Sequence, residues 1–175
     1  TGEERASYPM PKELKGWLVQ VRLWQDYIIG QIGKHVVCLD RHTGEIKWSF
    51  TASRPNLSLA VGGGHAYVAE LIDSRRGETI KDSGVKTYAL AIASGKEVWN
   101  APGGGKVRYS QPHDLLLAST AIYRGKDGEV HRTGAENDSK PESWNYENGG
   151  YIAGDNLLLG GSDHFVMHNL TSGDK

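Results

Sequence analysis

The chain contains a single cysteine, Cys38, among its 175 residues. One cysteine excludes an intrachain disulfide and a metal site made of thiolates alone. Cys38 lies in an apolar run at 36–39, and we therefore expect it to be a small buried hydrophobic residue. Cysteine content gives no indication of the compartment in which this protein works.

The chain also has little net charge and no long hydrophobic run. Its 20 Lys and Arg residues nearly balance its 21 Asp and Glu residues, which leaves a formal net charge of −1. Without a strong field of one sign, we expect neither nucleic acid nor an acidic membrane surface as a partner. No stretch approaches the roughly 18 consecutive apolar residues of a membrane helix, so we expect no membrane insertion.

What the chain does have is 23 glycines and a short motif that occurs twice. The stretch "LDRHTGEIKWSF" begins at Leu39, and "LAIASGKEVWNA" begins at Leu90. Aligned on glycine, the copies share a hydroxyl residue, the glycine and a later tryptophan: Thr43, Gly44 and Trp48, then Ser94, Gly95 and Trp99. We expect the glycine to form a turn at positive φ. The tryptophan is expected to pack between neighbouring sheets, with its N–H free to reach a backbone carbonyl.

Three further glycines mark weaker copies of the motif. Gly128 follows Asp127 in "IYRGKDGEVHR", where Arg132 stands at the tryptophan position. Gly173 lies near the end of the chain, and Gly2 resembles the same turn without its leading strand. The glycines divide the chain into repeat units at about 1–44, 45–95, 96–128 and 129–173. A period of roughly forty residues is typical of repeat architectures.

Each repeat is expected to contribute four short runs rich in Val, Ile, Leu and Tyr, bounded by Gly, Asp or Asn. The first set reads "WLVQVRL", "DYIIGQ", "HVVCLD" and "EIKWSF". Four short antiparallel strands per repeat are typical of a β-propeller blade, which buries its faces by stacking against neighbouring blades. The sequence therefore predicts a single all-β domain over 1–175, a partial β-propeller of about four four-stranded antiparallel blades.

The motif resembles the repeat of the PQQ-like (quinoprotein-like) β-propellers, with the pattern Ala-x-Asp-x-x-Thr-Gly-x-x-x-Trp. The first copy matches it through Asp40, Thr43, Gly44 and Trp48, with Cys38 in place of alanine. The second copy has Ala91 in place of the aspartate. Because a closed ring in that family has seven or eight blades, the resemblance implies a fragment of a larger bacterial protein. The alternative is ring closure within this chain, with residues 3–8 supplying the strand missing after Gly173.

The resemblance leaves two classes of function open. One is a non-catalytic binding or scaffolding module, like the outer-membrane assembly lipoprotein of similar fold, in the bacterial periplasm or cell envelope. Its partner would be another protein or the remaining blades of the parent protein. The alternative is a fragment of a PQQ-dependent quinoprotein dehydrogenase that uses PQQ and calcium. Those enzymes have adjacent cysteines and a Glu–Asn–Asp set, neither of which the motif supplies here, so we expect no catalytic centre and no cofactor.

The residues that we expect to bind a partner lie in two segments longer than a minimal blade needs, 73–84 and 132–150. One joins a second strand to a third, and the other joins one blade to the next. Strand alternation alone brings these two types of connection to the same face of the array. Aromatic and arginine side chains dominate binding hot spots. The ligand-binding candidates are Arg75, Arg76, Lys81, Trp144 and Tyr146. We expect no metal site, because His164 and His168 lack a clear third ligand.

Overall fold

The computed structural model describes residues 7–8, 14, 16–72, 83–119, 121–133, 151–160 and 165–172. These residues form four antiparallel sheets, which we name blades 1 to 4. Blade 1 contains β1 (Leu18–Trp24), β2 (Tyr27–Ile32), β3 (His35–Asp40) and β4 (Ile46–Thr51). Blade 2 contains β5 (Leu57–Gly62), β6 (His65–Glu70), β7 (Lys86–Ala91) and β8 (Glu97–Pro102). Blade 3 contains β9 (Arg108–Ser110), β10 (Leu115–Leu117), β11 (Ala121–Arg124) and β12 (Val130–Thr133), and blade 4 contains β13 (Tyr151–Ala153), β14 (Asn156–Gly160) and β15 (Phe165–Asn169).

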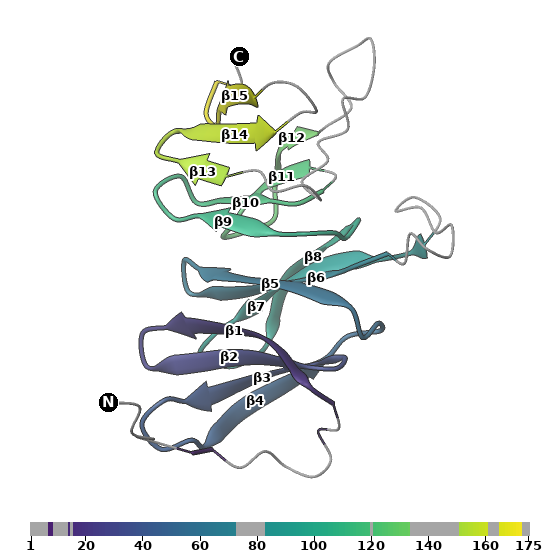
Figure 1. Cartoon of the computed structure of the whole chain (residues 1–175), viewed down its shortest axis with the longest axis vertical. Helices are drawn as coiled ribbons and strands as arrows, with labels where there is room; N and C mark the ends of the chain where they lie inside the picture. Colours follow the sequence, from purple (N-terminus) through teal and green to yellow (C-terminus); the bar gives the residue numbers. More distant parts are fainter. Residues whose placement is uncertain are drawn as a thin grey trace.

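This architecture confirms the predicted all-β partial propeller. In every blade, each strand pairs with the strands that precede and follow it in the sequence. Figure 1 shows the blades stacked along the long axis of the molecule, with blade 1 at the bottom and blade 4 at the top. The first strands of successive blades lie side by side, β1 against β5 and β5 against β9. Blades 1 and 4 occupy opposite ends of the stack, so this chain forms an open array and does not close a ring on itself (Figure 1).

Each predicted repeat unit ends at the turn glycine, whereas each four-stranded sheet ends one strand later. Gly44 lies between β3 and β4, in the connection between the third and fourth strands of its blade. A unit that ends on this glycine therefore assigns the fourth strand of one blade to the next unit. The same displacement applies to Gly95 and Gly128.

The core lies between the blades because side chains alternate along each strand. Ile29, Val36 and Trp48 of blade 1 face blade 2 and pack with Leu59 and Val68. The alternate side chains of blade 1 form a separate cluster on its other face: Ile28, Ile32, Val37, Leu39 and Ile46, with Tyr8 and Leu14. A second inter-blade layer joins blades 2 and 3, and a smaller one joins blades 3 and 4.

Two expectations from composition can be compared with the structure. Cys38 is fully buried in the layer between blades 1 and 2. Burial raises the pKa of its thiol to about 11, so the thiol stays protonated at neutral pH. The described part of the chain contains no helix with the length and apolarity needed to cross a bilayer.

Candidate functional site

The turn between the third and fourth strands has the same backbone geometry in three blades. Each glycine N–H donates to the carbonyl oxygen four residues earlier: Gly44 to Asp40 at 2.8 Å, Gly95 to Ala91 at 2.7 Å and Gly128 to Arg124 at 2.9 Å. The three glycines have φ values of 74°, 69° and 74°. These values lie in the left-handed region that favours glycine. Gly2 and Gly173 lie outside the described residues.

Asp40 and Asn169 begin this turn in the same way at the two ends of the molecule. Asp40 Oδ1 accepts hydrogen bonds from the backbone N–H groups of Thr43 at 3.0 Å and His42 at 2.9 Å. These bonds, that of Thr43 first, lower the pKa of the Asp40 carboxyl. Asn169 Oδ1 accepts an equivalent pair from the backbone of blade 4, both at 2.9 Å. The amide therefore replaces the carboxylate in a copy that the sequence motif barely identifies.

A further backbone hydrogen bond recurs in all four blades. It joins the residue that follows the third strand to the turn between the first two strands. The N–H to carbonyl pairs are Arg41 to Asp26 at 2.9 Å, Ile92 to Gly64 at 3.0 Å, Gly125 to Asp114 at 2.7 Å and Leu170 to Asp155 at 2.8 Å. Leu170 therefore occupies the place in blade 4 that Arg41 occupies in blade 1.

Trp48 joins blade 1 to blade 2, and Trp99 joins blade 2 to blade 3. Trp48 Nε1 donates to the carbonyl oxygen of Ile92 at 2.6 Å, and Trp99 Nε1 donates to that of Gly125 at 2.8 Å. Both carbonyls lie three residues before the turn glycine of the following blade. Both indoles are buried. In each case the indole ring lies over the turn glycine, and its N–H donates to the carbonyl oxygen three residues before that glycine. We name this arrangement the indole contact.

The indole contact gives the turn glycine a second reason to lack a side chain. A Cβ atom on Gly95 would lie 2.5 Å from Cγ of Trp48, and one on Gly128 would lie 2.6 Å from Cδ2 of Trp99. Any larger residue therefore meets the indole ring as well as an unfavourable φ. The sequence predicts the positive φ but not this close approach.

Tyr8 makes the equivalent contact on blade 1. Its ring lies over Gly44, and its hydroxyl donates to the carbonyl oxygen of Arg41. The motif does not identify Tyr8, because Tyr8 lies six residues after Gly2, whereas the aromatic residue of the motif lies four residues after the glycine. The number of residues between the aromatic side chain and the next strand could have identified Tyr8. Tyr8 precedes β1 by ten residues, and Trp48 and Trp99 precede β5 and β9 by nine.

The third blade differs, because Arg132 occupies its tryptophan position. Its turn is held by charged side chains: Arg124 pairs with Asp127 at 2.9 Å and with Glu129. The hydrogen bond between Arg124 and Asp127 raises the pKa of the guanidinium and lowers that of the carboxyl. Asp127 Oδ1 also accepts the N–H of Glu129 at 3.1 Å, as Thr43 Oγ1 accepts the N–H after Gly44 in blade 1.

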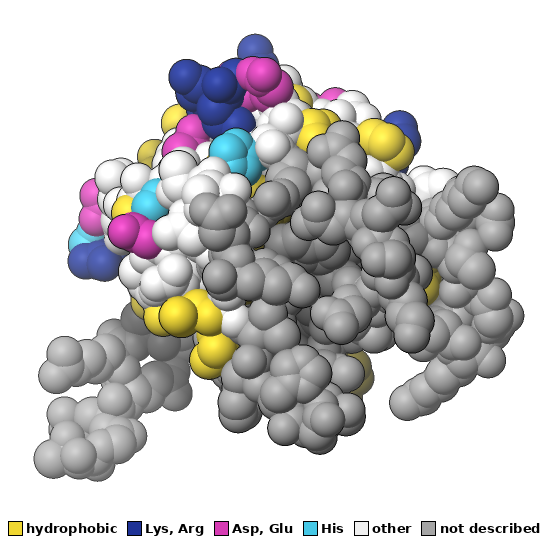
Figure 2. All heavy atoms as spheres, turned by 90° about the horizontal axis from the view of Figure 1, so that it is seen from above, with side chains coloured by type: hydrophobic (Ala, Val, Ile, Leu, Met, Phe, Trp, Pro, Cys, Tyr) yellow, Lys and Arg dark blue, Asp and Glu magenta, His cyan; other side chains and the backbone are white. Residues whose placement is uncertain are grey.

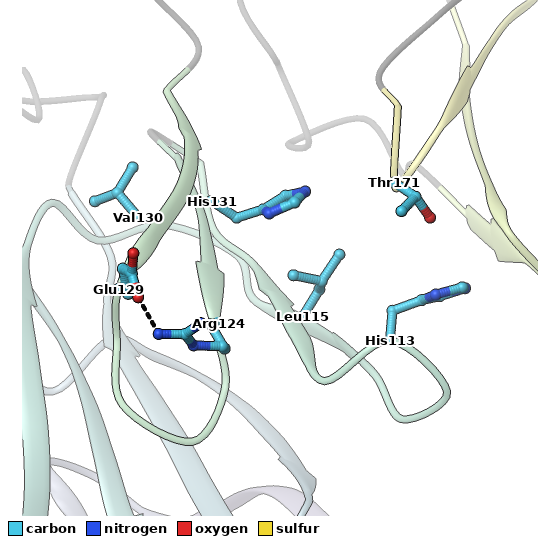
Figure 3. Close-up of a pocket in the computed structure, with 7 residues that line it drawn as sticks. All are labelled: His113, Leu115, Arg124, Glu129, Val130, His131 and Thr171. Atoms are coloured by element: carbon cyan, nitrogen blue, oxygen red, sulfur yellow. Dashed lines mark hydrogen bonds and ion pairs between the residues drawn. The ribbon is translucent and has the colours of Figure 1, made fainter.

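A cavity of about 400 Å³ lies between the turns of blades 3 and 4. Its lining residues are His113, Leu115, Arg124, Glu129, Val130, His131 and Thr171. Figure 3 shows Thr171 on blade 4 across an open space from the other six, which come from blade 3. The charge of Arg124 is compensated there by Glu129 and Asp127, and His113 Nε2 lies 3.1 Å from Asp155 Oδ1. The lining therefore does not select a class of ligand by charge.

The turns between first and second strands and between third and fourth strands lie on one side of the array, at the left of Figure 1, which we name the turn face. This side remains at the left of Figure 2, where basic, acidic and histidine side chains are interspersed. Asp26, for example, lies 3.0 Å from His42 Nε2 and 3.8 Å from Arg41 Nε. The turn face thus carries mixed charge, in keeping with the near-zero net charge of the chain.

A buried tyrosine, Tyr67, and a partly buried one, Tyr109, lie between blades 2 and 3. The rings of Tyr67 and Tyr109 stack with centroids 5.0 Å apart, and the Tyr109 hydroxyl donates to Asp114 Oδ1 at 2.8 Å. Burial raises the pKa of Tyr67 far above its usual range and that of Tyr109 to about 12. Both phenols therefore remain protonated near neutral pH, as packing residues do.

The opposite side, where second strands connect to third strands and blades connect to one another, we name the connection face. Glu70 is almost fully buried there, at the end of β6. Its Oε1 accepts hydrogen bonds from the N–H of Ser53 at 2.8 Å and from its hydroxyl at 2.6 Å, and its Oε2 accepts the N–H of Lys86 at 3.1 Å. Three donors compensate the burial of the charge. The two ends of the β6–β7 connection are thereby fixed to each other and to the connection between blades 1 and 2.

The ligand-binding candidates lie outside the described residues. Arg75, Arg76 and Lys81 belong to the β6–β7 connection, and Trp144 and Tyr146 belong to the β12–β13 connection. Because β6 and β12 are the second and fourth strands of their blades, both connections leave on the connection face. The role of these five residues stays a prediction.

The described residues do not provide what a quinone and calcium use in PQQ-like enzymes. Cys38 is buried in β3, and the chain has no second cysteine to pair with it. Among the residues whose positions are known, no three His, Cys, Asp or Glu side chains come together as metal ligands. Trp48 and Trp99 are both engaged in indole contacts. We therefore derive no step of quinone chemistry from this chain.

The stacked antiparallel blades define a β-propeller array. No protein-family model matches the sequence, and no curated protein matches it. Among solved structures, BamB from Moraxella catarrhalis matches with a TM-score of 0.58 and 15% identity, over 85% of this chain and 47% of BamB. The quinohemoprotein alcohol dehydrogenase ADHIIG from Pseudomonas putida matches with a TM-score of 0.59 and 14% identity, over 87% and 33%. The β-propeller domain of Swd1 from Myceliophteria thermophila matches with a TM-score of 0.63 and 15% identity, over 91% and 54%.

These likenesses concern the fold alone, because every identity is low. The chain spans about half the length of BamB and of the Swd1 domain, and about a third of the dehydrogenase. The array of four blades therefore matches only a part of each of these three structures.

Proposed function

We propose that this chain is a non-catalytic β-propeller module that binds or scaffolds other proteins within a larger bacterial protein of the periplasm or cell envelope. The observation that carries this proposal is the anchored β6–β7 connection. Glu70 is buried and accepts three hydrogen bonds, which tie both ends of that connection to the blades. A fixed base reduces the conformational entropy lost when a loop binds a partner.

The composition of the connection face supports a protein partner. Arg75 and Arg76 lie in the anchored connection, and Trp144 and Tyr146 lie in the second long connection of the same face. Arginine and aromatic side chains contribute most of the binding energy at protein interfaces. The motif tryptophans do not compete for this role, because they are buried between blades.

The test is capture of partners from a bacterial envelope extract by the purified chain. We expect a partner whose recovery falls at least about tenfold in R75A/R76A and in W144A/Y146A, as for loss of about 1.4 kcal/mol or more. K96A and K126A, exposed positions on the turn face, serve as controls and should retain it. Equal recovery by all variants, or equal loss in the controls, would contradict a binding site on the connection face.

The second candidate is a fragment of a PQQ-dependent dehydrogenase. We retain it because the fold of this chain is also similar to that of the dehydrogenase ADHIIG. Addition of PQQ and calcium to the purified chain separates the two candidates. We expect no change in the quinone absorbance and no reduction of a dye by an alcohol. Dye reduction that requires both PQQ and calcium would favour the dehydrogenase and contradict the binding module.

A further inference from the structure

Blade 2 presents a group of aromatic rings to blade 3. The ring centroid of Tyr67 lies 6.1 Å from that of Trp99 and 5.8 Å from that of His65. His65 and Tyr67 are two residues apart on β6, so their side chains point to the same face of the sheet. Trp99 and Tyr67 belong to the layer between blades 2 and 3, where the Trp99 indole donates to the next blade. These rings fill the space beside the turn of blade 3.

Strand register identifies the residue of blade 3 that corresponds to Trp99. Trp99 pairs across the strands with Ala89, and the next pair toward the turn is separated from it by a bulge. In blade 3, Arg132 pairs with Ile122, and a bulge follows in the same place. Arg132 therefore occupies the strand position of Trp99, as the motif predicts from the sequence alone.

The second strand of blade 3 differs in the same sense. Counted from the pairs that β6 and β10 make with their third strands, Leu117 corresponds to Tyr67 and Leu115 corresponds to His65. Both leucines belong to the apolar layer between blades 3 and 4. The three positions that carry rings in blade 2 therefore carry two leucines and an arginine in blade 3.

The cavity between the turns of blades 3 and 4 lies beside these positions, because Leu115 lines it. Thr171, on the opposite wall, directly follows Leu170. The Leu170 carbonyl is equivalent to the carbonyl that Trp99 binds in blade 3. Figure 3 shows the side chains of Leu115 and His131 extending into the open space in front of Thr171. The volume of about 400 Å³ suits a small ligand, since pockets for small molecules measure about 300–1,000 Å³.

The charges of the lining favour a neutral ligand. Arg124 pairs with both Asp127 and Glu129, so its charge is already compensated and does not select an anion. No three metal-ligating side chains converge in the part of the chain that the structure describes, so the lining does not select a metal ion either. The contacts that the cavity offers are therefore apolar surface, from Leu115 and Val130, and uncharged polar groups.

We propose that this cavity binds a small, neutral, planar aromatic molecule with an N–H donor, of the indole class. Its ring takes the place of the motif tryptophan beside Leu115, and its N–H donates to the Leu170 carbonyl as Trp99 donates to that of Gly125. The bound ring covers apolar surface of both blades and stabilises their contact by mass action. The cavity lies on the turn face, so its failure to bind would leave the partner site proposed on the connection face unaffected.

Titration of the isotope-labelled chain with indole, followed through amide chemical shifts, tests the proposal. We expect saturable binding with a Kd of about 1 mM or below, and the largest shifts in blades 3 and 4, Leu170 included. N-Methylindole has the same ring without the N–H donor and should bind about threefold to tenfold more weakly. Absence of saturation below about 10 mM indole, or equal binding of the two molecules, would overturn the proposal.

Two tryptophan variants test the location of the site. Arg132→Trp supplies the motif indole from the chain itself and should weaken indole binding at least about tenfold, because the two rings compete for one place. Val98→Trp adds a tryptophan at an exposed position of β8 and should bind indole as wild type does. Circular dichroism checks that both variants fold. Equal indole affinity in wild type and Arg132→Trp would contradict the assigned site.

Amide hydrogen exchange of the wild-type chain provides a measurement that needs no variant. Saturating indole should slow exchange of the Leu170 amide several-fold, because the ligand holds blade 4 against blade 3. The Ile92 amide, whose interface already has its tryptophan, should exchange at the same rate with and without indole. No slowing at Leu170, or equal slowing at both amides, would contradict binding between blades 3 and 4.

Discussion

The interface between blades 3 and 4 differs from the two interfaces before it in one residue type. Between blades 1 and 2, and between blades 2 and 3, a buried indole lies over a turn glycine and donates to the carbonyl three residues earlier. At the interface between blades 3 and 4 the motif position is occupied by Arg132 in the sequence, and a cavity of about 400 Å³ lies between the turns of these two blades. Blade 3 has the same strand order and the same glycine turn as blades 1 and 2, so at blade 3 the difference lies in side chains and not in topology.

The comparison teaches that a propeller array need not be uniformly stable along its length. Repeat proteins owe their stability to the repeats and to each interface between neighbours. The apolar layers beside Trp48 and Trp99 contain large aromatic side chains, whereas the side chains that the structure describes in the layer between blades 3 and 4 are five buried aliphatic residues and Ile152. We therefore expect blade 4 to separate from the array at a lower free energy than blades 1 to 3 separate from one another.

Removal of an indole should have the largest effect. Trp99→Ala deletes a buried ring and leaves the Gly125 carbonyl without its donor, so we expect a loss of about 3–5 kcal/mol in the free energy of unfolding. Urea unfolding followed by circular dichroism measures it. Val98→Ala, at the exposed neighbouring position, is the matched control and should cost no more than about 0.5 kcal/mol. Similar losses in the two variants would mean that the indole contact does not stabilise the array.

A side chain on the turn glycine should act on the same contact from the other blade. Gly95→Ala places Cβ against Trp48 at a φ of 69°, whereas Gly64→Ala places it in open space at a φ of 80°. The left-handed conformation costs both variants about 1–2 kcal/mol. We expect Gly95→Ala to lose a further 1–3 kcal/mol or so from the collision with the ring. Equal midpoints in urea for the two variants would exclude a steric role for Trp48.

A tryptophan in place of Arg132 should stabilise the interface between blades 3 and 4 and so bring its stability closer to that of the other two interfaces. Arg132→Trp places the ring at the motif position opposite the turn of blade 4, where the Leu170 carbonyl is equivalent to those of Ile92 and Gly125. We expect about 1 kcal/mol of added stability in blade 4, seen as several-fold slower hydrogen exchange of its amides. Arg132→Ala separates this gain from simple loss of the arginine. No slowing in the tryptophan variant relative to the alanine variant would contradict the expectation.

The smallest expected effect on stability is that of a substitution at Asp40. Asn169 occupies the equivalent position in blade 4. Because hydrogen bonds hold the pKa of Asp40 in the folded state below its unfolded value, its ionisation contributes stability above the unfolded pKa. That contribution is lost as the pH falls through the folded pKa. Asp40→Asn keeps both backbone bonds and should change stability little at pH 7, with weaker acid dependence, whereas Asp40→Ala loses the two side-chain bonds but keeps the turn, as Ala91 does in blade 2. Melting temperatures from pH 7 to pH 3 measure this, and equal acid dependence of wild type and Asp40→Asn would contradict it.

The all-β fold, the blade strands and the glycine turn follow from local sequence. Alternating apolar runs and the Thr43-Gly44 and Ser94-Gly95 turns determine short-range structure, which one chain segment specifies by itself. Contacts between blades are different, because they join residues far apart in the sequence. The ring of Trp48 over Gly95 and the use of Tyr8 in place of a tryptophan depend on stacking geometry that no short motif contains.

For the candidate binding site, too, the sequence predicts one feature and not another. Strand alternation is enough to bring the connections of Arg75 and Trp144 to one face, since that follows from strand number alone. The buried carboxylate of Glu70 could not be predicted, because Glu is a residue type expected at the surface. Its three donors come from two segments, near Ser53 and Lys86, that only the folded blade places together.

Amide hydrogen exchange at four equivalent positions tests the central comparison most directly. Arg41, Ile92, Gly125 and Leu170 make the same backbone hydrogen bond in successive blades, and the first three carry a carbonyl bound by Tyr8, Trp48 or Trp99. We predict that Leu170 exchanges at least about tenfold faster than the other three, a difference of about 1.4 kcal/mol in opening free energy. Arg41 controls for position, because it too lies in an end blade. Protection of Leu170 equal to that of Ile92 and Gly125 would contradict the claim that the indole contact sets the strength of each interface.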